Sequence, residues 1–116
     1  MAKMQAKMNQ PKPTYRVEFV ERTGLKRLEV GRGYAKLLMP LKGNENHVDV
    51  LYMGAYTVLA EAVAAIPGIS ILDTERFFPI LKDIYVHFKK SAASDVTAEF
   101  RLSEAELEAL LADLER

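Results

Sequence analysis

The chain has no cysteine among its 116 residues, and this absence removes several kinds of chemistry at once. Without thiols there is no disulfide, no thiolate metal site and no cysteine nucleophile, and the composition fits a cytoplasmic protein. An excess of charge of one sign is also missing, because 16 basic and 16 acidic residues cancel to a formal net charge of zero. A neutral chain without a dense basic face gives little support to nucleic-acid binding.

Long apolar runs are absent as well. The longest run is far below the roughly 18 residues that span a bilayer, and the N-terminus lacks the apolar core of a secretion signal. The two histidines, His47 and His87, are far apart in the sequence and have no acidic cluster beside them, so they make no credible metal site. We therefore expect a soluble cytoplasmic protein with no metal, no nucleic-acid partner and no membrane partner.

The residues that are present are organised around one stretch, YMGAYTVLAEAVAAI, which covers residues 52–66. Its small and apolar residues predict a helix that ends at Pro67-Gly68. Because these residues occupy most directions round the helix axis, we expect other structure to cover the helix on several sides. Glu61 is the single carboxylate of the stretch. A carboxylate in such surroundings has either a structural partner, such as a tyrosine or Lys82, or a chemical task.

Other patterns predict a sheet and two further helices. Residues 15–21 suit a short helix, and Ser103 with Glu106 forms a capping box that starts a leucine-striped amphipathic helix. Alternating apolar residues predict five strands, two of them within residues 25–42 around a turn at 31–33, and the others at 68–74, 78–89 and 96–102. The last strand is expected to pair antiparallel with residues 78–89.

We predict a single domain over residues 14–116, preceded by a flexible leader at residues 1–13, where two prolines block helix continuation. The fold class is α+β. An antiparallel sheet curled round one long helix is the economical architecture, because only a helix held inside a curved sheet needs apolar residues on nearly every side.

Three segments in order resemble the hotdog-fold thioesterase superfamily, in particular its small, poorly characterised bacterial members. They are GRGYAKLLMPLKGNENH, MGAYTVLAEA and HFKKSAASDVTAEFRL, and the resemblance runs from about Phe19 to Leu102. It implies a hotdog fold, in which a curved antiparallel sheet wraps round one long central helix. Hotdog domains usually continue past the position of Leu102 with further strands, so we expect the C-terminal strands of the usual fold to be missing here.

The resemblance also implies an activity and a site. The activity is hydrolysis of acyl-CoA or another small thioester by a homodimer or tetramer, with coenzyme A as part of the substrate and no other cofactor. In the family, amides at the helix start polarise the thioester carbonyl, and an acid from the partner subunit acts as general base or nucleophile. The matching positions here are Met53, Gly54 and Glu61. The implied substrate-binding residues are Asn46, His47, Tyr52, Tyr56 and Thr57.

Helix geometry gives this chemistry a physical basis. Unpaired N–H groups at a helix start, with the positive end of the helix dipole, can stabilise an oxyanion. A carboxylate in apolar surroundings is a better base near neutral pH. Gly54 and Glu61 lie roughly 10 Å apart along one axis at 1.5 Å per residue, so a common site needs a second subunit. We expect Thr57 to orient the Glu61 carboxylate and Tyr56 to line the acyl pocket.

Two function classes remain open. The first is an acyl-CoA thioesterase, and the second is a non-catalytic hotdog module that binds an acyl ligand or serves as a dimeric scaffold. The retained Glu61 favours the enzyme. Tyr52 and Met53 favour the binding module, because they replace the histidine and first glycine with which the family opens this helix.

Several polar residues have simpler explanations than substrate binding. From residue chemistry alone, Asn46 suits a turn and His47 a loop or a cap. His87 belongs to the polar face of a predicted strand. Lys89-Lys90, together with Arg76, either meets the phosphates of coenzyme A or forms a solvated turn.

Overall fold

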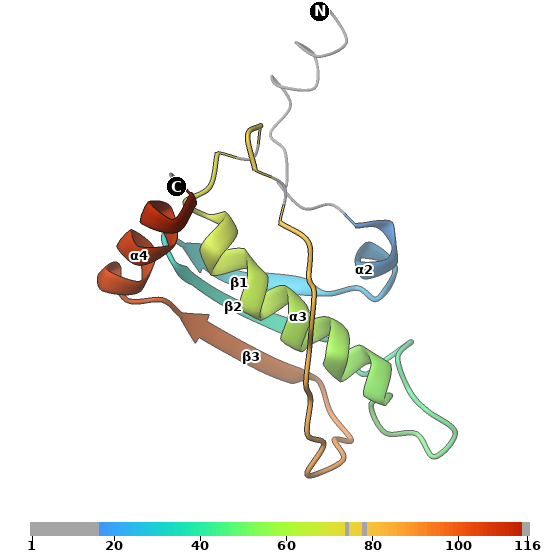
Figure 1. The fold of residues 1–116 in the computed structure, drawn as a ribbon. Coiled ribbons are helices and arrows are strands. Elements are labelled where there is room, and N and C mark those ends of the chain that lie inside the picture. The colour runs from blue at the N-terminus through green and yellow to red at the C-terminus, as the bar shows by residue number, and fades with distance from the viewer. Residues whose placement is uncertain (1–16, 74, 78, 115–116) are drawn as a thin grey trace, which may run out of the picture.

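The computed structural model describes residues 17–73, 75–77 and 79–114, which form a three-stranded antiparallel sheet with a long helix on one face (Figure 1). The predicted α+β class is therefore confirmed. A three-stranded sheet with a central helix is consistent with a hotdog fold but does not distinguish it from other folds, so that assignment stays a prediction. The predicted leader at residues 1–13 lies outside the described residues.

The sheet has the order β1-β2-β3, with β1 at Lys26–Gly31, β2 at Tyr34–Met39 and β3 at Val96–Arg101. Both pairings are antiparallel, and the two strands predicted within residues 25–42 form the β1–β2 hairpin. The strand predicted at 96–102 is also present. Its predicted partner was wrong, because β3 pairs with β2 along its whole length.

Side-chain alternation along β2 shows which face of the sheet holds the core. Ala35, Leu37 and Met39 are fully buried, whereas the residues between them are only partly covered. On the edge strand β1 every residue is exposed, and the register shifts between Arg27 and Glu29. The core therefore lies under the central strand, on the face that meets the long helix.

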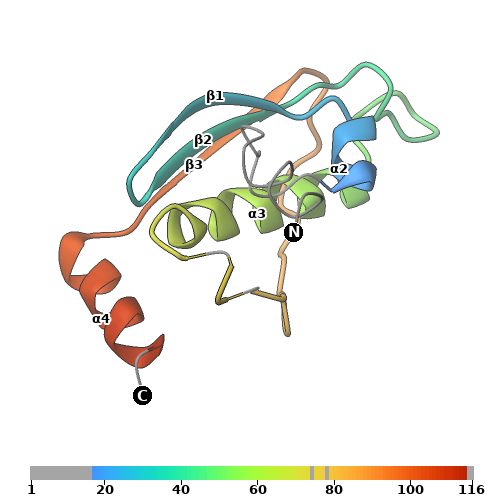
Figure 2. The same ribbon diagram turned by 90° about the horizontal axis from the view of Figure 1, so that it is seen from above.

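The long helix, α3 at Met53–Ile69, packs across that face (Figures 1 and 2). Its buried side chains recur at helical spacing and form one stripe toward the sheet, at Ala55, Leu59, Val63 and Ile66. On its other side Ala64 is exposed and Glu61 only partly covered. Among the residues of α3 only Met53 and Ala64 are exposed, and residues 79–90 cross the helix on the side away from the sheet (Figures 1 and 2), so the expectation that structure covers it on several sides is met in part.

The helix also continues past its predicted end. Pro67 and Gly68 lie inside α3, which ends at Ile69. Pro67 removes one backbone donor, but it is buried, and its fixed φ is compatible with helical geometry. Ser70 closes the last turn, where its amide donates to the Ile66 carbonyl at 2.9 Å and its hydroxyl to the Pro67 carbonyl at 2.6 Å.

Two predicted strands are not formed. The stretch 68–74 instead completes α3 and turns, and its last residue, Thr74, lies outside the described part. Residues 79–90, described below as the crossing segment, run across α3 on the side away from the sheet, without pairing to any strand (Figures 1 and 2). Their alternating sequence suits a strand, but they lie over α3 and not beside the open outer edge of β3 (Figures 1 and 2). Tyr85 of this segment is 89% exposed.

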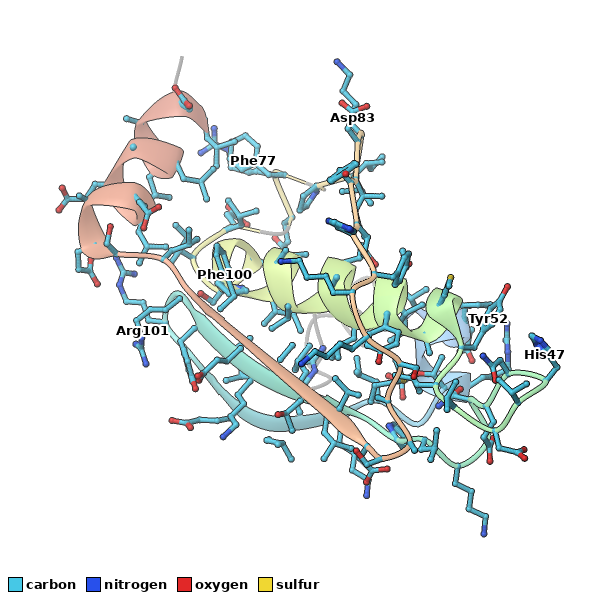
Figure 3. The ribbon with its side chains drawn as sticks, turned by 90° about the horizontal axis from the view of Figure 1, so that it is seen from below. His47, Tyr52, Phe77, Asp83, Phe100 and Arg101 are labelled. Carbon is cyan, nitrogen blue, oxygen red and sulfur yellow. The ribbon has the colours of Figure 1, made fainter. Side chains whose placement is uncertain are left out.

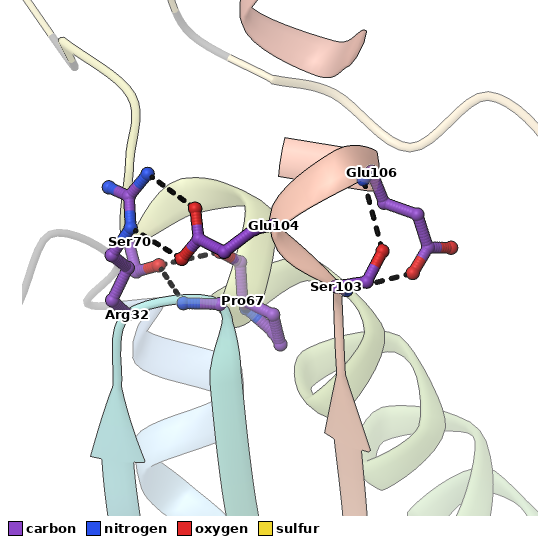
Figure 4. Close-up of polar contacts among 7 residues, drawn as sticks. Arg32, Pro67, Ser70, Ser103, Glu104 and Glu106 are labelled. Atoms are coloured by element: carbon purple, nitrogen blue, oxygen red, sulfur yellow. Dashed lines mark hydrogen bonds and ion pairs between the residues drawn. The ribbon is translucent and has the colours of Figure 1, made fainter. Parts of the chain in front are cut away.

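Two shorter helices complete the described part of the chain. The short helix α2 covers Glu18–Arg22, close to its prediction, and α4 covers Glu104–Leu114. The predicted capping box of α4 is confirmed, because the Glu106 amide donates to Ser103 Oγ at 3.1 Å and the Ser103 amide donates to Glu106 Oε1 at 2.8 Å (Figure 4). The backbone bond from Ser103, followed by its side-chain bond, lowers the pKa of Glu106.

A polar corner joins the β1–β2 turn to the ends of α3 and β3 (Figure 4). Gly33, with φ of 68°, donates its amide to Ser70 Oγ at 2.8 Å. Arg32 donates to both carboxylate oxygens of Glu104 at 3.2 and 3.3 Å, and this contact lowers the pKa of Glu104. A side chain at Gly33 would come within 2.8 Å of the buried Leu107, so the close packing explains the glycine.

Candidate functional site

The start of α3 presents unpaired backbone donors. Tyr52 precedes the helix in an extended conformation, and its carbonyl accepts the Ala55 amide at 2.9 Å and the Tyr56 amide at 3.3 Å. The Met53 and Gly54 amides make no hydrogen bond within the described residues, and no side chain caps the helix. Two N–H groups at the positive end of the helix therefore have no acceptor within the part of the chain that the structure describes.

The loop before α3 is held by two asparagines. The Asn44 side chain donates to the carbonyls of Thr23 and Pro40, both at 2.8 Å, and its own carbonyl accepts the Tyr52 amide at 2.9 Å. Asn46 Oδ1 accepts the amides of Val48 at 2.9 Å and Val50 at 3.2 Å. These bonds fix where α3 begins, in keeping with the prediction that Asn46 serves a turn.

The side chains near the helix start point in different directions. His47 lies at the exposed loop tip, and Tyr52 lies at the beginning of α3 (Figure 3). The Tyr52 ring packs over Gly54, because a Cβ atom at that glycine would come within 2.6 Å of the ring. The glycine therefore allows the ring to approach, while 59% of the tyrosine remains exposed.

The next turn of α3 holds Tyr56 and Thr57. The Tyr56 hydroxyl donates to the Lys90 carbonyl at 3.3 Å, and its ring meets Phe88 edge-on at 5.9 Å between centroids. The Thr57 hydroxyl donates to the Met53 carbonyl at 3.0 Å. The expectation that Thr57 orients Glu61 is therefore not met in this structure, because its hydroxyl is used one turn back along the helix.

Glu61 is partly exposed and has no hydrogen-bond or ion-pair partner within residues 17–73, 75–77 and 79–114. The structural alternative weighed from the sequence, a bond to a tyrosine or to Lys82, is therefore absent from that part of the chain. The carboxylate lines a groove of about 610 Å³. An unpaired carboxylate beside apolar walls is available for proton transfer or for contact with a ligand.

This groove lies between α2, the start of β1, α3 and the crossing segment. Most of its walls are apolar, formed among others by Val20, Leu25, Ala65, Ile69, Ile80 and Ile84. Four charged residues also line it, namely Glu21, Arg27, Glu61 and Asp83. A volume of this size falls within the roughly 300–1,000 Å³ typical of small-molecule sites.

Tyr56 lines a second, smaller groove of about 340 Å³. The other walls of that groove come from α3, β3 and the last residues of the crossing segment, including Leu59, Phe88 and Ala98. Tyr56, which was expected to line an acyl pocket, therefore lines this second groove. What fills that pocket stays a prediction.

Of the predicted site residues, Tyr52, Met53 and Gly54 lie together at the helix start, next to the loop of Asn46 and His47. Glu61 lies two turns further along and faces a groove that none of those residues line. Glu21, Arg27 and Asp83 were not predicted, because they come from separate segments with no shared motif. No group of three or more potential metal ligands occurs among the described residues, and none of the described helices could cross a membrane.

A family model and a solved structure are both similar to this chain. A family model for a domain of unknown function, DUF4442, matches residues 16–115. The chain is also similar to a crystal structure of a Pseudomonas aeruginosa protein of unknown function, described as a probable thioesterase, with a TM-score of 0.77 and 34% identity. The match covers 85% of this chain and 66% of that protein, so the chain spans about two thirds of its length. No curated protein matches the chain.

Proposed function

The chain belongs to the DUF4442 family, and from this premise we propose that it is an acyl-CoA thioesterase whose site is shared between two subunits. The observation that carries the proposal is the α3 helix itself. It has two unpaired amides at its start and an unpaired carboxylate beside an apolar groove two turns later. Similarity to a probable thioesterase supports the same reaction class.

In the proposed reaction the thioester carbonyl oxygen accepts hydrogen bonds from the Met53 and Gly54 amides, which stabilise the developing oxyanion. Glu61 of the partner subunit takes a proton from water, and the water oxygen attacks the carbonyl carbon. The carbon–sulfur bond then breaks, and the sulfur leaves as a thiol with the proton that Glu61 took from water, while the acid product remains. Direct attack by the Glu61 carboxylate on the carbonyl, followed by hydrolysis of the anhydride, gives the same products.

Two subunits are needed because of distance. The helix start and Glu61 are roughly 10 Å apart along α3 at 1.5 Å per residue, beyond the reach of one carbonyl group. A two-fold arrangement would bring the helix start of one chain to the groove of the other. We propose that the Tyr52 and Tyr56 rings border the acyl group, with Asn46, His47 and Thr57 near the carrier. The exposed Lys89 and Lys90 would meet the phosphates of coenzyme A.

The crowded helix start favours a second candidate, a module that binds an acyl ligand or forms a dimeric scaffold without catalysis. The Tyr52 ring lies over Gly54, one of the two proposed oxyanion donors. A thioester carbonyl can reach that amide only if the ring turns aside. The half-exposed ring has room to turn, so this observation does not exclude the enzyme.

A free-thiol release assay over a panel of acyl-CoA esters distinguishes these candidates. We expect the purified protein to release coenzyme A from esters with medium-length or aromatic acyl groups, well above the rate without protein. Absence of release across the whole panel, from protein that still binds the esters, would favour the binding module.

The assembly makes a separate prediction. Light scattering at micromolar concentration is expected to give the mass of a dimer or a tetramer, because a shared site does not exist in a single chain. A monomeric mass at concentrations where thiol release is measured would contradict the shared site. Such a result would not contradict the hydrolase activity itself.

A further inference from the structure

The groove beside Glu61 carries an uneven set of charges. Its three carboxylates, Glu21, Glu61 and Asp83, and its one guanidinium, Arg27, give the lining a net charge of −2. They come from α2, α3, the crossing segment and β1 respectively. Figure 3 shows Asp83 on the crossing segment, well away from His47 and Tyr52 at the helix start. The rest of the lining is mainly aliphatic.

None of these four side chains is neutralised by a contact within the described part of the chain, where no ion pair or side-chain hydrogen bond involves them. Their charges therefore act on whatever occupies the groove. An aliphatic wall favours a hydrocarbon, because burying apolar surface is favourable by about 25 cal/mol per Å². Unpaired carboxylates at the same wall disfavour an anion, because like charges repel even across a partly exposed groove.

We infer that this groove holds the acyl group of the substrate, that the acyl group is an uncharged hydrocarbon, and that Glu21 and Asp83 exclude acyl chains ending in a carboxylate. This inference rests on the proposed function and adds a substrate class to it. Arg27 is the one positively charged residue of the lining. The two negative charges of Glu21 and Asp83 exceed its charge even when Glu61 is not counted. Glu21 and Asp83 thus determine specificity without touching the reacting atoms.

Binding of thioether analogues tests the inference without requiring catalysis, because a thioether cannot be hydrolysed. The two probes are S-octyl-coenzyme A and S-(7-carboxyheptyl)-coenzyme A, which have equal chain lengths and differ by one terminal carboxylate. Calorimetry is expected to show roughly tenfold weaker binding of the carboxylated probe, and this difference should shrink near 1 M salt, where the screening length falls to about 3 Å.

Variants identify the residues responsible. In the double variant Glu21→Gln with Asp83→Asn, the preference is expected to fall below about threefold, because each substitution keeps the side-chain shape and removes one charge. Glu29→Gln is the matched control. Glu29 is exposed and lies opposite Lys36 in the β1–β2 register, on the face of the sheet away from α3, so removal of its charge should leave the preference unchanged.

The outcomes separate the inference from the proposed function. Equal binding of both probes, tighter binding of the carboxylated probe, or no binding of either would overturn the inference. A preference that is unchanged in the double variant would overturn the role of Glu21 and Asp83. Selective binding of S-octyl-coenzyme A by a protein that does not hydrolyse octanoyl-coenzyme A would refute the hydrolase while leaving the groove specificity in place.

Discussion

Replacing Glu61 by glutamine is expected to lower kcat for thioester hydrolysis by about a thousandfold, within the range typical for loss of a general acid–base group. Glutamine keeps the size and polarity of the side chain but cannot accept the proton of the attacking water. The binding of substrate should change little, so the loss should appear in kcat and leave KM nearly unaltered. Free-thiol release under saturating acyl-CoA measures this effect.

Two controls make the Glu61 result specific. Thermal unfolding of Glu61→Gln should match that of the parent protein, because the carboxylate has no hydrogen-bond or ion-pair partner among the described residues to lose. Glu29→Gln, which removes an exposed carboxylate from the far face of the sheet, should retain full activity. Equal thiol release from the Glu61 variant and the parent would eliminate the proposed mechanism.

Replacing Met53 by proline is expected to lower kcat by about 10²–10³-fold, the usual cost of losing one oxyanion donor. Proline removes the amide hydrogen at the first helical position, where it is well tolerated. The preceding residue, Tyr52, already has ψ of 142°, which is the extended conformation that proline requires before it. The helix should therefore form as before, and thermal unfolding should stay unchanged or rise slightly.

The matched control is Met53→Ala, which shortens the same exposed side chain but keeps the amide. Its activity should remain close to that of the parent protein, so the comparison isolates one N–H group. If the alanine and proline variants lose activity equally, the side chain of Met53 matters and its amide does not. If both retain full activity, the start of α3 is not the oxyanion site.

Together the two variants test whether one site draws on two chains. A dimer formed from one Glu61→Gln chain and one Met53→Pro chain holds one intact pair of amides and carboxylate across its interface. When equal amounts of the two inactive proteins are unfolded and refolded together, about a quarter of the parent activity is expected, because half of the dimers are mixed and each holds one intact site. No recovery in confirmed mixed dimers would place both groups in one subunit.

Local sequence patterns predicted the elements that local chemistry determines. The hairpin around Gly33, the capping box of Ser103 and Glu106, and the long apolar helix are all present. In each case the signal lies within a few residues. It is a glycine with positive φ for the hairpin, a reciprocal pair of hydrogen bonds for the capping box, and a helical repeat of apolar residues for the long helix. The start of the candidate site was predictable for the same reason, since unpaired amides follow from where a helix begins.

The failures have longer-range causes. Residues 78–89 alternate as a strand should, yet pairing requires a strand edge beside them, and the described residues of this segment lie over α3 instead of along the outer edge of β3 (Figures 1 and 2). Pro67 predicted the end of the helix because proline lacks a backbone donor. In the structure its ring is buried, and the hydrogen bonds of Ser70 close one further turn of the helix. The groove charges escaped prediction because Glu21, Arg27 and Asp83 meet only after α2, β1 and the crossing segment are packed against α3.

The position of β2 between its two neighbours also bears on how the chain folds. Its hairpin partner β1 is adjacent in sequence, but Leu37 lies opposite Ala98, 61 positions later. Forming the second pairing closes a long loop, whose entropic cost precedes any gain from the new hydrogen bonds. During synthesis the edge of β2 that receives β3 therefore remains open until residues 96–101 leave the ribosome, and for that interval it is available to strands of other chains.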